Sequence, residues 1–267
     1  MKQPIAERVI LLLCCLFIVT SAGNVMAAVN PDPLIMADLQ AIFNETAQVE
    51  GYPYQELLAA AADKYNLPLP FVLAVVRGES FFDPAAKSSK GAIGLMQVLP
   101  STAADYGLKA DDLFDPAKNI DMGTHYLSDL HTRLGDPYLT LAAYYCGCGG
   151  VDKEGLTLRK DCDEYVHYIH THLTKVLASA TGKATSVTEA ERHFVLTQFD
   201  NFLDAENFLQ YLLSSLPQLQ LDLFRREVMY QDNSRYEYQI LVTYAKKGEK
   251  DKICREVEKA TGFSFCR

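Results

Sequence analysis

The chain has the sequence ESFFDPAAKSSKGAIGLMQ from Glu79 to Gln97. An apolar segment with helical periodicity leads up to Glu79, and a loop rich in glycine and serine follows it. The pattern places one glutamate at the end of a buried helix. Because burial disfavours the charged form of a carboxyl group, it raises the pKa, and such an acid can protonate a leaving glycosidic oxygen. The stretch predicts a glycan-cleaving enzyme with Glu79 as general acid.

Helical patterns continue on both sides of this stretch. Pro70 suits the first turn of a helix, where its missing N–H costs nothing, and apolar residues recur at helical spacing from residue 71 to 78. Asp115 and Pro116 predict the N-cap and first turn of another helix. No segment between residues 53 and 176 alternates with a period of two. We therefore expect an all-α domain over residues 52–178, preceded by a lead-in over 28–51.

The sequence changes character after this domain. A run of small and hydroxyl residues predicts a linker over 179–190, and alternating patterns then predict strands. The expected strands and helices are His193–Phe199, Asp204–Leu213, Leu219–Met229, Tyr236–Tyr244, Glu249–Ala260 and Phe263–Cys266. Their order, βαββαβ, is that of the ferredoxin-like split motif. We predict a small α+β domain over 191–267.

The first 27 residues have the pattern of a secretory signal peptide, with basic residues, an apolar run and small residues before the expected cleavage site. The apolar run from Val9 to Thr20 is shorter than the roughly 20 residues of a membrane span. We expect export to the periplasm and no stable membrane insertion after cleavage. Cys14 offers a lipoprotein alternative, but Leu13 stands where a small residue is needed.

Charge and cysteines narrow the expected partners and compartment. The net charge is −9 without a cluster of Lys and Arg, which argues against nucleic acid. Five cysteines follow the signal peptide: Cys146, Cys148, Cys162, Cys254 and Cys266. In an oxidising compartment they predict two disulfides and one remaining thiol. We expect Cys254 and Cys266 to join the last helix to the last strand.

Several blocks of sequence occur together in an order that resembles the soluble lytic transglycosylase family, over roughly residues 55–176. The blocks are Glu79-Ser80-x-Phe82-Asp83-Pro84, Gly91-Ala92-x-Gly94-Leu95-Met96-Gln97, Phe114-Asp115-Pro116, Asn119-Ile120, Gly123, Tyr126-Leu127 and Leu141-Ala142-Ala143-Tyr144. The resemblance implies a lysozyme-like helical fold that cleaves peptidoglycan glycan strands between N-acetylmuramic acid and N-acetylglucosamine. It implies no cofactor.

The resemblance also implies the chemistry. Glu79 donates its proton to the leaving oxygen and then acts as base on the muramyl 6-hydroxyl, which gives a 1,6-anhydro product. Ser88, Met96, Gln97 and Tyr144 are implied to line the groove. Core packing is the alternative for Met96, and a buried structural role is the alternative for Tyr144.

Two positions depart from the family pattern. Tyr145 stands where the family usually has asparagine, and Asp161-Cys162 stands where a Glu-Thr pair is common. We expect Tyr145 and Asp161 to affect the groove rather than the reaction class. The family brings the loop at 147–149 near Asp161, which implies a disulfide between Cys148 and Cys162 with Cys146 as the remaining thiol.

The C-terminal part resembles the SPOR domains that bind peptidoglycan, mainly in the order of its strands and helices. We expect this domain to hold the enzyme near its substrate without altering the chemistry, and a purely structural cap is the alternative. Cell-envelope secretion or division machinery is a further candidate partner, and the sequence does not identify which machinery the protein serves.

Two rival functions remain, a hydrolytic muramidase of the lysozyme type and a non-catalytic glycan-binding module. His167 and His170 share a helical face without a third ligand at suitable spacing, so we expect no metal site.

Overall fold

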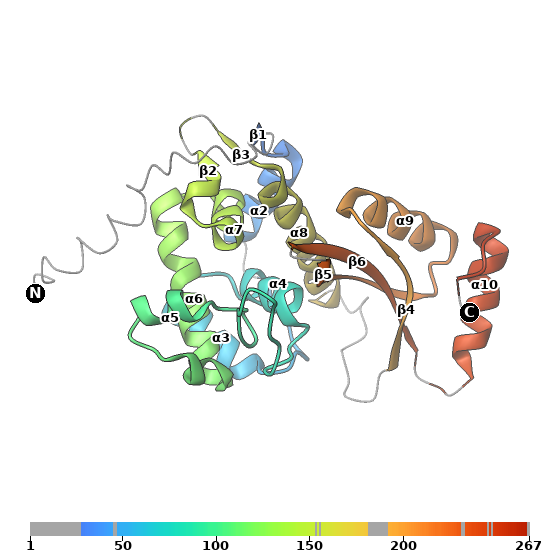
Figure 1. The fold of residues 1–267 in the computed structure, drawn as a ribbon, viewed down its shortest axis with the longest axis horizontal. Helices are drawn as coiled ribbons and strands as arrows, with labels where there is room; N and C mark the ends of the chain where they lie inside the picture. Colours follow the sequence, from blue (N-terminus) through green and yellow to red (C-terminus); the bar gives the residue numbers. More distant parts are fainter. Residues whose placement is uncertain are drawn as a thin grey trace, which may run out of the picture.

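The computed structural model describes residues 28–44, 47–152, 154, 156–180, 192–230, 233–244, 246 and 248–265. A helical body lies beside a three-stranded sheet that carries two helices (Figure 1). The predicted signal peptide and most of the predicted linker lie outside the described residues. In the described part of the chain, no helix is long and apolar enough to cross a membrane.

The helical body follows the predicted pattern closely. Its helices are α2 (Pro33–Asn44), α3 (Gln55–Lys64), α4 (Leu69–Ser80), α5 (Pro100–Asp105), α6 (Pro116–Leu134), α7 (Pro137–Cys146) and α8 (Lys160–Ala180), with 3-10 helices η1 (Ala110–Phe114) and η2 (Cys148–Gly150). The Asp115 carboxylate accepts the N–H groups of Ala117 and Lys118, as expected of an N-cap. The prediction of a helical domain is confirmed.

A small antiparallel sheet completes this body and was not predicted. It consists of β1 (Ala28–Val29), β2 (Val151–Asp152) and β3 (Thr157–Arg159), in the order β1-β3-β2. Ala28 pairs with Arg159, and Val151 pairs with Leu158. Strands of two or three residues are too short to show an alternating pattern in the sequence.

Helix α4 is the centre of the helical body. Residues 71–76 are fully buried, so the helix is surrounded by its neighbours. Gly78 lets α8 approach closely, because a Cβ at this position would lie 2.4 Å from the side chain of Ile169. The Tyr168 hydroxyl donates to the Gly78 carbonyl oxygen at 2.9 Å. The C-terminal end of α4 is thereby held directly against α8.

The C-terminal part contains β4 (Arg192–Phe199), α9 (Phe202–Ser215), β5 (Gln220–Tyr230), β6 (Asn233–Tyr244) and α10 (Glu249–Thr261). The sheet is antiparallel in the order β4-β6-β5, with Ile240 and Val242 of the central strand fully buried. The predicted final strand is wrong in its described part, because residues 263–265 form no strand. The described order is therefore βαββα.

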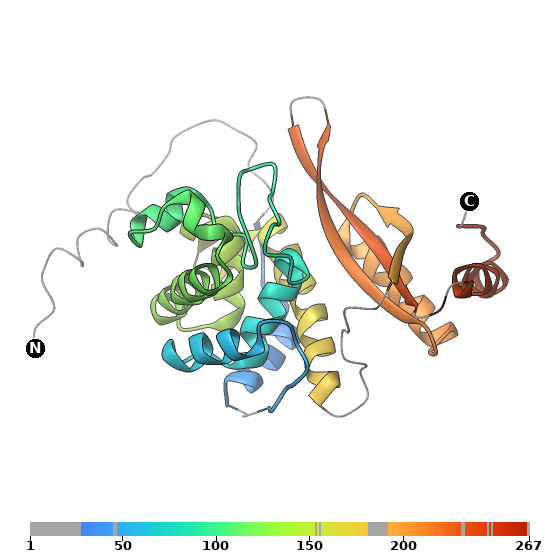
Figure 2. The same ribbon diagram turned by 90° about the horizontal axis from the view of Figure 1, so that it is seen from below.

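The sheet packs against the helical body through β5 and β6, which lie beside α8 in both views (Figures 1 and 2). The Asp222 carboxylate of β5 accepts from Arg77 of α4 at 2.5 Å and also from Lys175 of α8. Phe81 and Phe224 meet edge to face, with ring centroids 5.1 Å apart. These contacts join the two parts through buried charges as well as aromatic rings.

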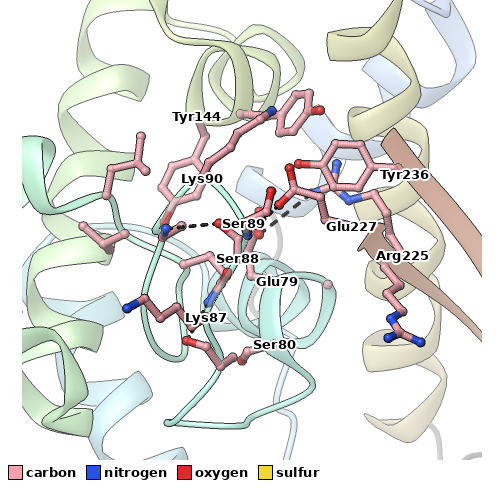
Figure 3. Close-up of a pocket in the computed structure, with 18 of the residues that line it drawn as sticks. Glu79, Ser80, Lys87, Ser88, Ser89, Lys90, Tyr144, Arg225, Glu227 and Tyr236 are labelled. Atoms are coloured by element: carbon pink, nitrogen blue, oxygen red, sulfur yellow. Dashed lines mark hydrogen bonds and ion pairs between the residues drawn. The ribbon is translucent and has the colours of Figure 1, made fainter. Parts of the chain in front are cut away.

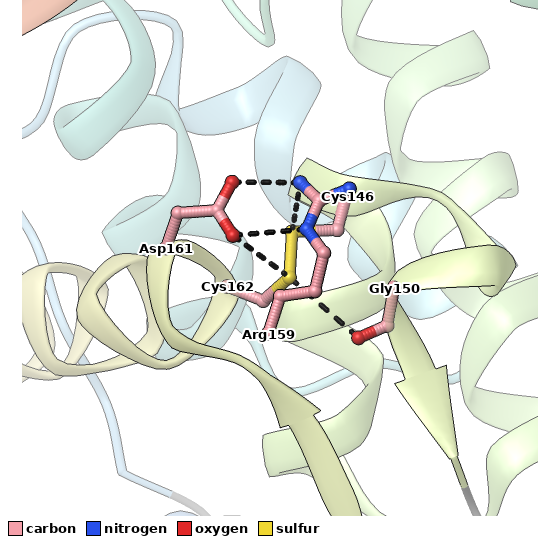
Figure 4. Close-up of a disulfide and its surroundings, with 5 residues drawn as sticks. All are labelled: Cys146, Gly150, Arg159, Asp161 and Cys162. Carbon is pink, nitrogen blue, oxygen red and sulfur yellow. Dashed lines mark hydrogen bonds and ion pairs between the residues drawn. A yellow bond between two sulfur atoms is a disulfide. The ribbon is translucent and has the colours of Figure 1, made fainter. Parts of the chain in front are cut away.

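The disulfide of the helical body differs from the prediction. Cys146, the last residue of α7, is bonded to Cys162 in the first turn of α8 (Figure 4). The expected Cys148–Cys162 bridge is therefore wrong. The Cys148 sulfur instead lies 3.4 Å from Nη1 of Arg133. The physical reason is that η2 follows directly after α7, so the helix end itself lies against α8.

Only one of the two cysteines in the second predicted disulfide is among the described residues. Cys254 of α10 is disulfide-bonded, and its predicted partner, Cys266, lies outside the described residues.

Candidate active site

Glu79 lies in the last turn of α4, and its side chain is 10% exposed. The Tyr165 hydroxyl of α8 donates to Glu79 Oε1 at 2.5 Å. Arg225 of β5 places Nη2 3.9 Å from Glu79 Oε2. One oxygen of the carboxyl group thus faces a neutral donor, and the other faces a cation.

The surroundings of Glu79 act on its pKa in opposite directions. Burial raises this pKa, while Arg225 and the hydrogen bond from Tyr165 lower it, and the net direction is upward. Burial also raises the pKa of Tyr165 well above its usual value, so its hydroxyl keeps the proton it donates. The predicted direction for Glu79, a carboxyl group made less acidic by its apolar setting, is confirmed.

The loop after α4 forms one wall of the site. Ser88 and Gln97 both line the cavity. The Ser88 hydroxyl accepts the Ala92 N–H at 3.1 Å, and the Gln97 amide donates to the carbonyl oxygens of Ala86 and Gly94. Both side chains therefore also shape the loop that presents them.

Asn119 of α6 stabilises this loop through three side-chain hydrogen bonds. Its side chain is fully buried, accepts the Met96 N–H at 2.8 Å and donates to the carbonyl oxygens of Ile93 and Leu113. Gly94 has a φ of +78°, and a Cβ there would lie 2.4 Å from the Asn119 amide nitrogen. Glycine at position 94 is thus required by both backbone conformation and space.

Helix α7 contributes two adjacent tyrosines to the cavity. The Tyr144 hydroxyl donates to the Met96 carbonyl oxygen at 2.7 Å, so this side chain both lines the cavity and supports the loop. Tyr145 stacks on Tyr165, with ring centroids 4.8 Å apart and planes 11° apart. The residue that departs from the family pattern is therefore in direct contact with the hydrogen-bond donor to Glu79.

Two predicted groove residues lie elsewhere. Met96 is fully buried and is not among the residues that line the cavity; its sulfur accepts from the Thr124 hydroxyl. Core packing, the alternative considered for this residue, describes its position. Asp161 also lies off the cavity wall and pairs with Arg159 at 2.6 Å beside the disulfide (Figure 4). The ion pair with Arg159, two residues earlier in the chain, holds the Asp161 carboxylate away from the cavity.

The cavity itself has a volume of about 700 Å³ and is lined from both parts of the chain. Ser88, Lys90 and Tyr144 come from the helical body, and Arg225, Glu227 and Tyr236 come from the sheet (Figure 3). The Ser89 N–H donates to Glu227 Oε2 at 2.9 Å. The groove beside Glu79 is therefore built by both the helical body and the sheet.

Neither the residues that the sheet supplies nor the role of Tyr165 was predicted from the sequence. Tyr165 follows the Asp161-Cys162 pair by three residues, and this closeness to a position that departs from the family pattern was the available signal. Arg225 carried no clear signal, because β5 also contains the polar residues Gln220, Asp222 and Glu227.

Comparisons with known proteins agree with this geometry. A profile of the family described as Transglycosylase SLT domain matches residues 56–163. Membrane-bound lytic murein transglycosylase E of Buchnera aphidicola is 31% identical over 159 residues, covering 54% of this chain and 69% of that protein. The chain belongs to the lytic murein transglycosylase family. The predicted family resemblance of the helical domain is thus confirmed.

In other lytic transglycosylases, the region that matches this chain is only part of the protein. Membrane-bound lytic murein transglycosylase C of Yersinia enterocolitica is 38% identical over 118 residues, which cover 38% of this chain and 33% of that protein. The match thus spans about a third of the Yersinia protein. An inactive mutant of lytic transglycosylase Slt from Pseudomonas aeruginosa aligns with a TM-score of 0.41 and 23% identity, over 51% of this chain and 25% of that chain.

The family profile ends at residue 163, well before the C-terminal sheet. The SPOR-like and ferredoxin-like expectations for residues 191–267 therefore stay predictions. The domain boundaries within this family member also stay predictions.

Proposed function

We propose that the protein is a peptidoglycan lytic transglycosylase that cleaves the bond between N-acetylmuramic acid and N-acetylglucosamine and leaves 1,6-anhydro ends. The observation that carries the proposal is the buried Glu79 carboxyl group beside a cavity of about 700 Å³, in a chain of the lytic murein transglycosylase family. Glu79 is the catalytic residue. Periplasmic location, after removal of residues 1–27, is part of the proposal.

The two oxygens of Glu79 support a division of labour. Because Tyr165 donates to Oε1, the acidic proton of Glu79 belongs on Oε2. From there it passes to the leaving glycosidic oxygen as the C–O bond breaks. The resulting carboxylate then takes the proton of the muramyl 6-hydroxyl, whose oxygen attacks the anomeric carbon. The proton count closes, since Glu79 ends as it began.

Hydrolysis by a lysozyme-type muramidase is the main rival. Most glycosidases use two carboxylates. Among the described residues that line the cavity, the other carboxylates are Asp83 and Glu227, and both accept hydrogen bonds from loop N–H groups, of Ala85 and Ser89 respectively. Such contacts support structural roles for both, which favours chemistry that depends on Glu79 alone.

Mass spectrometry of the muropeptides released from purified peptidoglycan tests the proposal. The full chain is expected to release 1,6-anhydro products, and Glu79→Gln is expected to lower the rate by at least about 10²–10⁴-fold, the usual value of general acid–base catalysis. Asp83→Asn, which keeps a side-chain acceptor for the turn, is expected to stay within about tenfold of wild type. Reducing ends in place of anhydro ends would establish hydrolysis instead, and no cleavage at all would leave the non-catalytic glycan-binding module.

We further propose that the C-terminal domain binds the same glycan strand. Its support is the position of Tyr236, Arg226 and Glu227 on the cavity wall, where an aromatic ring and polar groups suit a sugar surface. Tyr236→Ala in the full chain is expected to raise KM for glycan strands. An unchanged KM would leave the structural-cap alternative. Association with secretion or division machinery stays a prediction.

A further inference from the structure

Arg225 lies at the meeting point of the two domains and contacts the catalytic glutamate. It belongs to β5, outside the region matched by the family profile. Its side chain is 6% exposed, and Nη2 lies 3.9 Å from Glu79 Oε2. A buried guanidinium is costly unless it has partners, so its place beside Glu79 requires an explanation.

The surroundings of Arg225 fix its position. Its guanidinium lies over four tyrosine rings, at 4.3 Å from Tyr236, 4.7 Å from Tyr145, 4.8 Å from Tyr165 and 5.3 Å from Tyr168. Two of these rings come from α8, one from α7 and one from β6. Rings within about 6 Å stabilise a cation electrostatically. The backbone N–H of Arg225 donates to the Tyr168 hydroxyl oxygen at 3.3 Å, which fixes the strand that carries the side chain.

Aromatic rings stabilise the cation without neutralising it. The negative charge that balances Arg225 therefore comes from Glu79, through their ion pair. Burial opposes the charge of Arg225, but Glu79 and the tyrosines outweigh that effect and raise the pKa of Arg225. The site therefore keeps a permanent positive charge next to the oxygen that gives up its proton.

We propose that Arg225 is a positioning residue of the active site, supplied by the C-terminal domain, that stabilises the Glu79 carboxylate formed when the proton passes to the leaving sugar. This inference rests on the proposed function and adds a residue to it. The C-terminal domain then takes part in the chemistry as well as in binding, contrary to the expectation that it leaves the chemistry unaltered.

The groups that act on Glu79 and Arg225 come from every neighbouring element. Glu79 is faced by Tyr165 and Tyr168 from α8, Tyr144 from α7 and Arg225 from β5. Arg225 is faced by Tyr145, Tyr165, Tyr168, Tyr236, Tyr238 and Glu79. The tyrosines whose pKa values are raised stay neutral at physiological pH. Two further groups lie close by: Lys90 of the loop after α4 lies over the Tyr145 and Tyr236 rings, and the buried His172 of α8 feels the charge of Arg225. Glu79 and Arg225 form the ion pair that the proposal concerns.

The sign of the effect follows from this arrangement. An opposite charge at this distance lowers the pKa of a carboxyl group by about 1–3 units. Removal of the cation is therefore expected to raise the pKa of Glu79 by about 1–3 units. Because Glu79 acts first as an acid, the alkaline limb of kcat/KM moves to higher pH. The plateau rate falls by about 3- to 30-fold, if half of the pKa change is felt in the transition state.

The experiment compares the full-length wild type with Arg225→Met, Arg225→Lys and the control Arg235→Met. Arg235 is on β6 of the same sheet, with its side chain 47% exposed and paired with Asp200 and Glu237. The first readout is the pH profile of kcat/KM on soluble glycan strands. We expect Arg225→Met to move the alkaline limb upward, and Arg225→Lys and Arg235→Met to stay near wild type.

A second readout needs no catalysis. Infrared difference spectra between each variant and its Glu79→Gln counterpart follow the protonated carboxyl band of Glu79 with pH. The midpoint is expected to rise by about 1–3 units in Arg225→Met. An unchanged midpoint, or an equal shift in Arg225→Lys, overturns the proposal. Absence of anhydro product from the wild type would refute the proposed function alone, because the infrared midpoint does not depend on it.

Discussion

The guanidinium of Arg77 on α4 lies 2.5 Å from the Asp222 carboxylate on β5, and the two side chains are only 7% and 18% exposed. Arg77 precedes Glu79, the proposed catalytic residue, by two residues, and Asp222 precedes Arg225 by three. This ion pair therefore fixes the strand that carries Arg225 to the helix that carries Glu79. The same Asp222 carboxylate also accepts from Lys175 of α8.

Asp222→Asn is expected to destabilise the protein by about 3–5 kcal/mol, because it leaves the buried Arg77 and the partly buried Lys175 without a counter-charge. Thermal unfolding of the full chain measures this. The matched control is Asp200→Asn, whose carboxylate is 73% exposed and pairs with Arg235 at 3.5 Å; its effect is expected to stay below about 1 kcal/mol. Equal losses of stability in the two variants would show that the pair of Asp222 and Arg77 contributes no more than an exposed ion pair.

The ion pair of Asp222 and Arg77 also predicts how the packing of the C-terminal sheet against the helical body depends on pH. Burial alone would raise the pKa of Asp222, but Lys175 and Arg77 outweigh it and hold that pKa well below its usual 3.8. A lowered folded-state pKa stabilises the protein above the unfolded-state value and loses that contribution as pH falls through the folded-state value. We expect small-angle scattering to show docked domains at pH 4 to 7 and separation only in stronger acid. In Asp222→Asn, the acid-dependent step should disappear.

Tyr165→Phe is expected to lower kcat by about 10- to 100-fold, since a hydrogen bond to a charged group is worth about 1.5–3 kcal/mol. The hydroxyl donates to Glu79 Oε1 at 2.5 Å, and its loss should also raise the pKa of Glu79. Tyr168→Phe is a useful comparison, because that hydroxyl binds the Gly78 carbonyl oxygen rather than Glu79. A pH profile that shifts equally in both variants would argue against a specific role for Tyr165.

Asn119→Ala is expected to destabilise the loop that carries Gln97, because it leaves the Met96 N–H and two carbonyl oxygens without their buried partner. Each such group costs about 1–3 kcal/mol. Activity should fall together with the unfolding temperature. Asn119→Asp keeps the acceptor for Met96 but places a buried carboxyl group against the two carbonyl oxygens, so it should be at least as destabilising as Asn119→Ala. A stable, active Asn119→Ala would contradict this account of the loop.

Cys146→Ser is expected to destabilise the helical domain by about 3 kcal/mol in the chain-entropy model, since the bridge joins residues 16 positions apart. Cys148→Ser removes a neighbouring sulfur and keeps the bridge, so its effect should be small. Peptide mapping without reductant is expected to find Cys146 joined to Cys162. A Cys148–Cys162 peptide as the main product would contradict the structure.

Much of the fold was predictable because strong local patterns decide it. Asp115 and Pro116 specify a helix start by capping chemistry, and the alternation of Tyr238, Ile240 and Val242 specifies a central strand whose inward side chains are buried. Neither pattern depends on the rest of the chain. The prediction of a final strand failed because the segment 263–265 is too short and too exposed for an alternating pattern to decide its structure.

The site was only half predictable, for a physical reason. Glu79 lies at a helix end marked by the sequence around it, so its burial could be expected. Arg225 lies 146 positions later, and only the packing of β5 against α8 brings it to Glu79. The choice between Cys146 and Cys148 likewise depended on which residue ends α7. Local patterns carry no information about such contacts.

The position of β5 has one more consequence, for aggregation. In the described sheet β5 pairs only with β6, so its other side is an open edge. The helical domain covers part of that edge, where Tyr168 accepts the Arg225 N–H and Lys175 donates to the Leu221 carbonyl oxygen. Exposed strand edges recruit other strands and promote self-association. A C-terminal domain expressed alone should therefore tend to form oligomers, and sedimentation with cell walls would overstate its affinity for glycan.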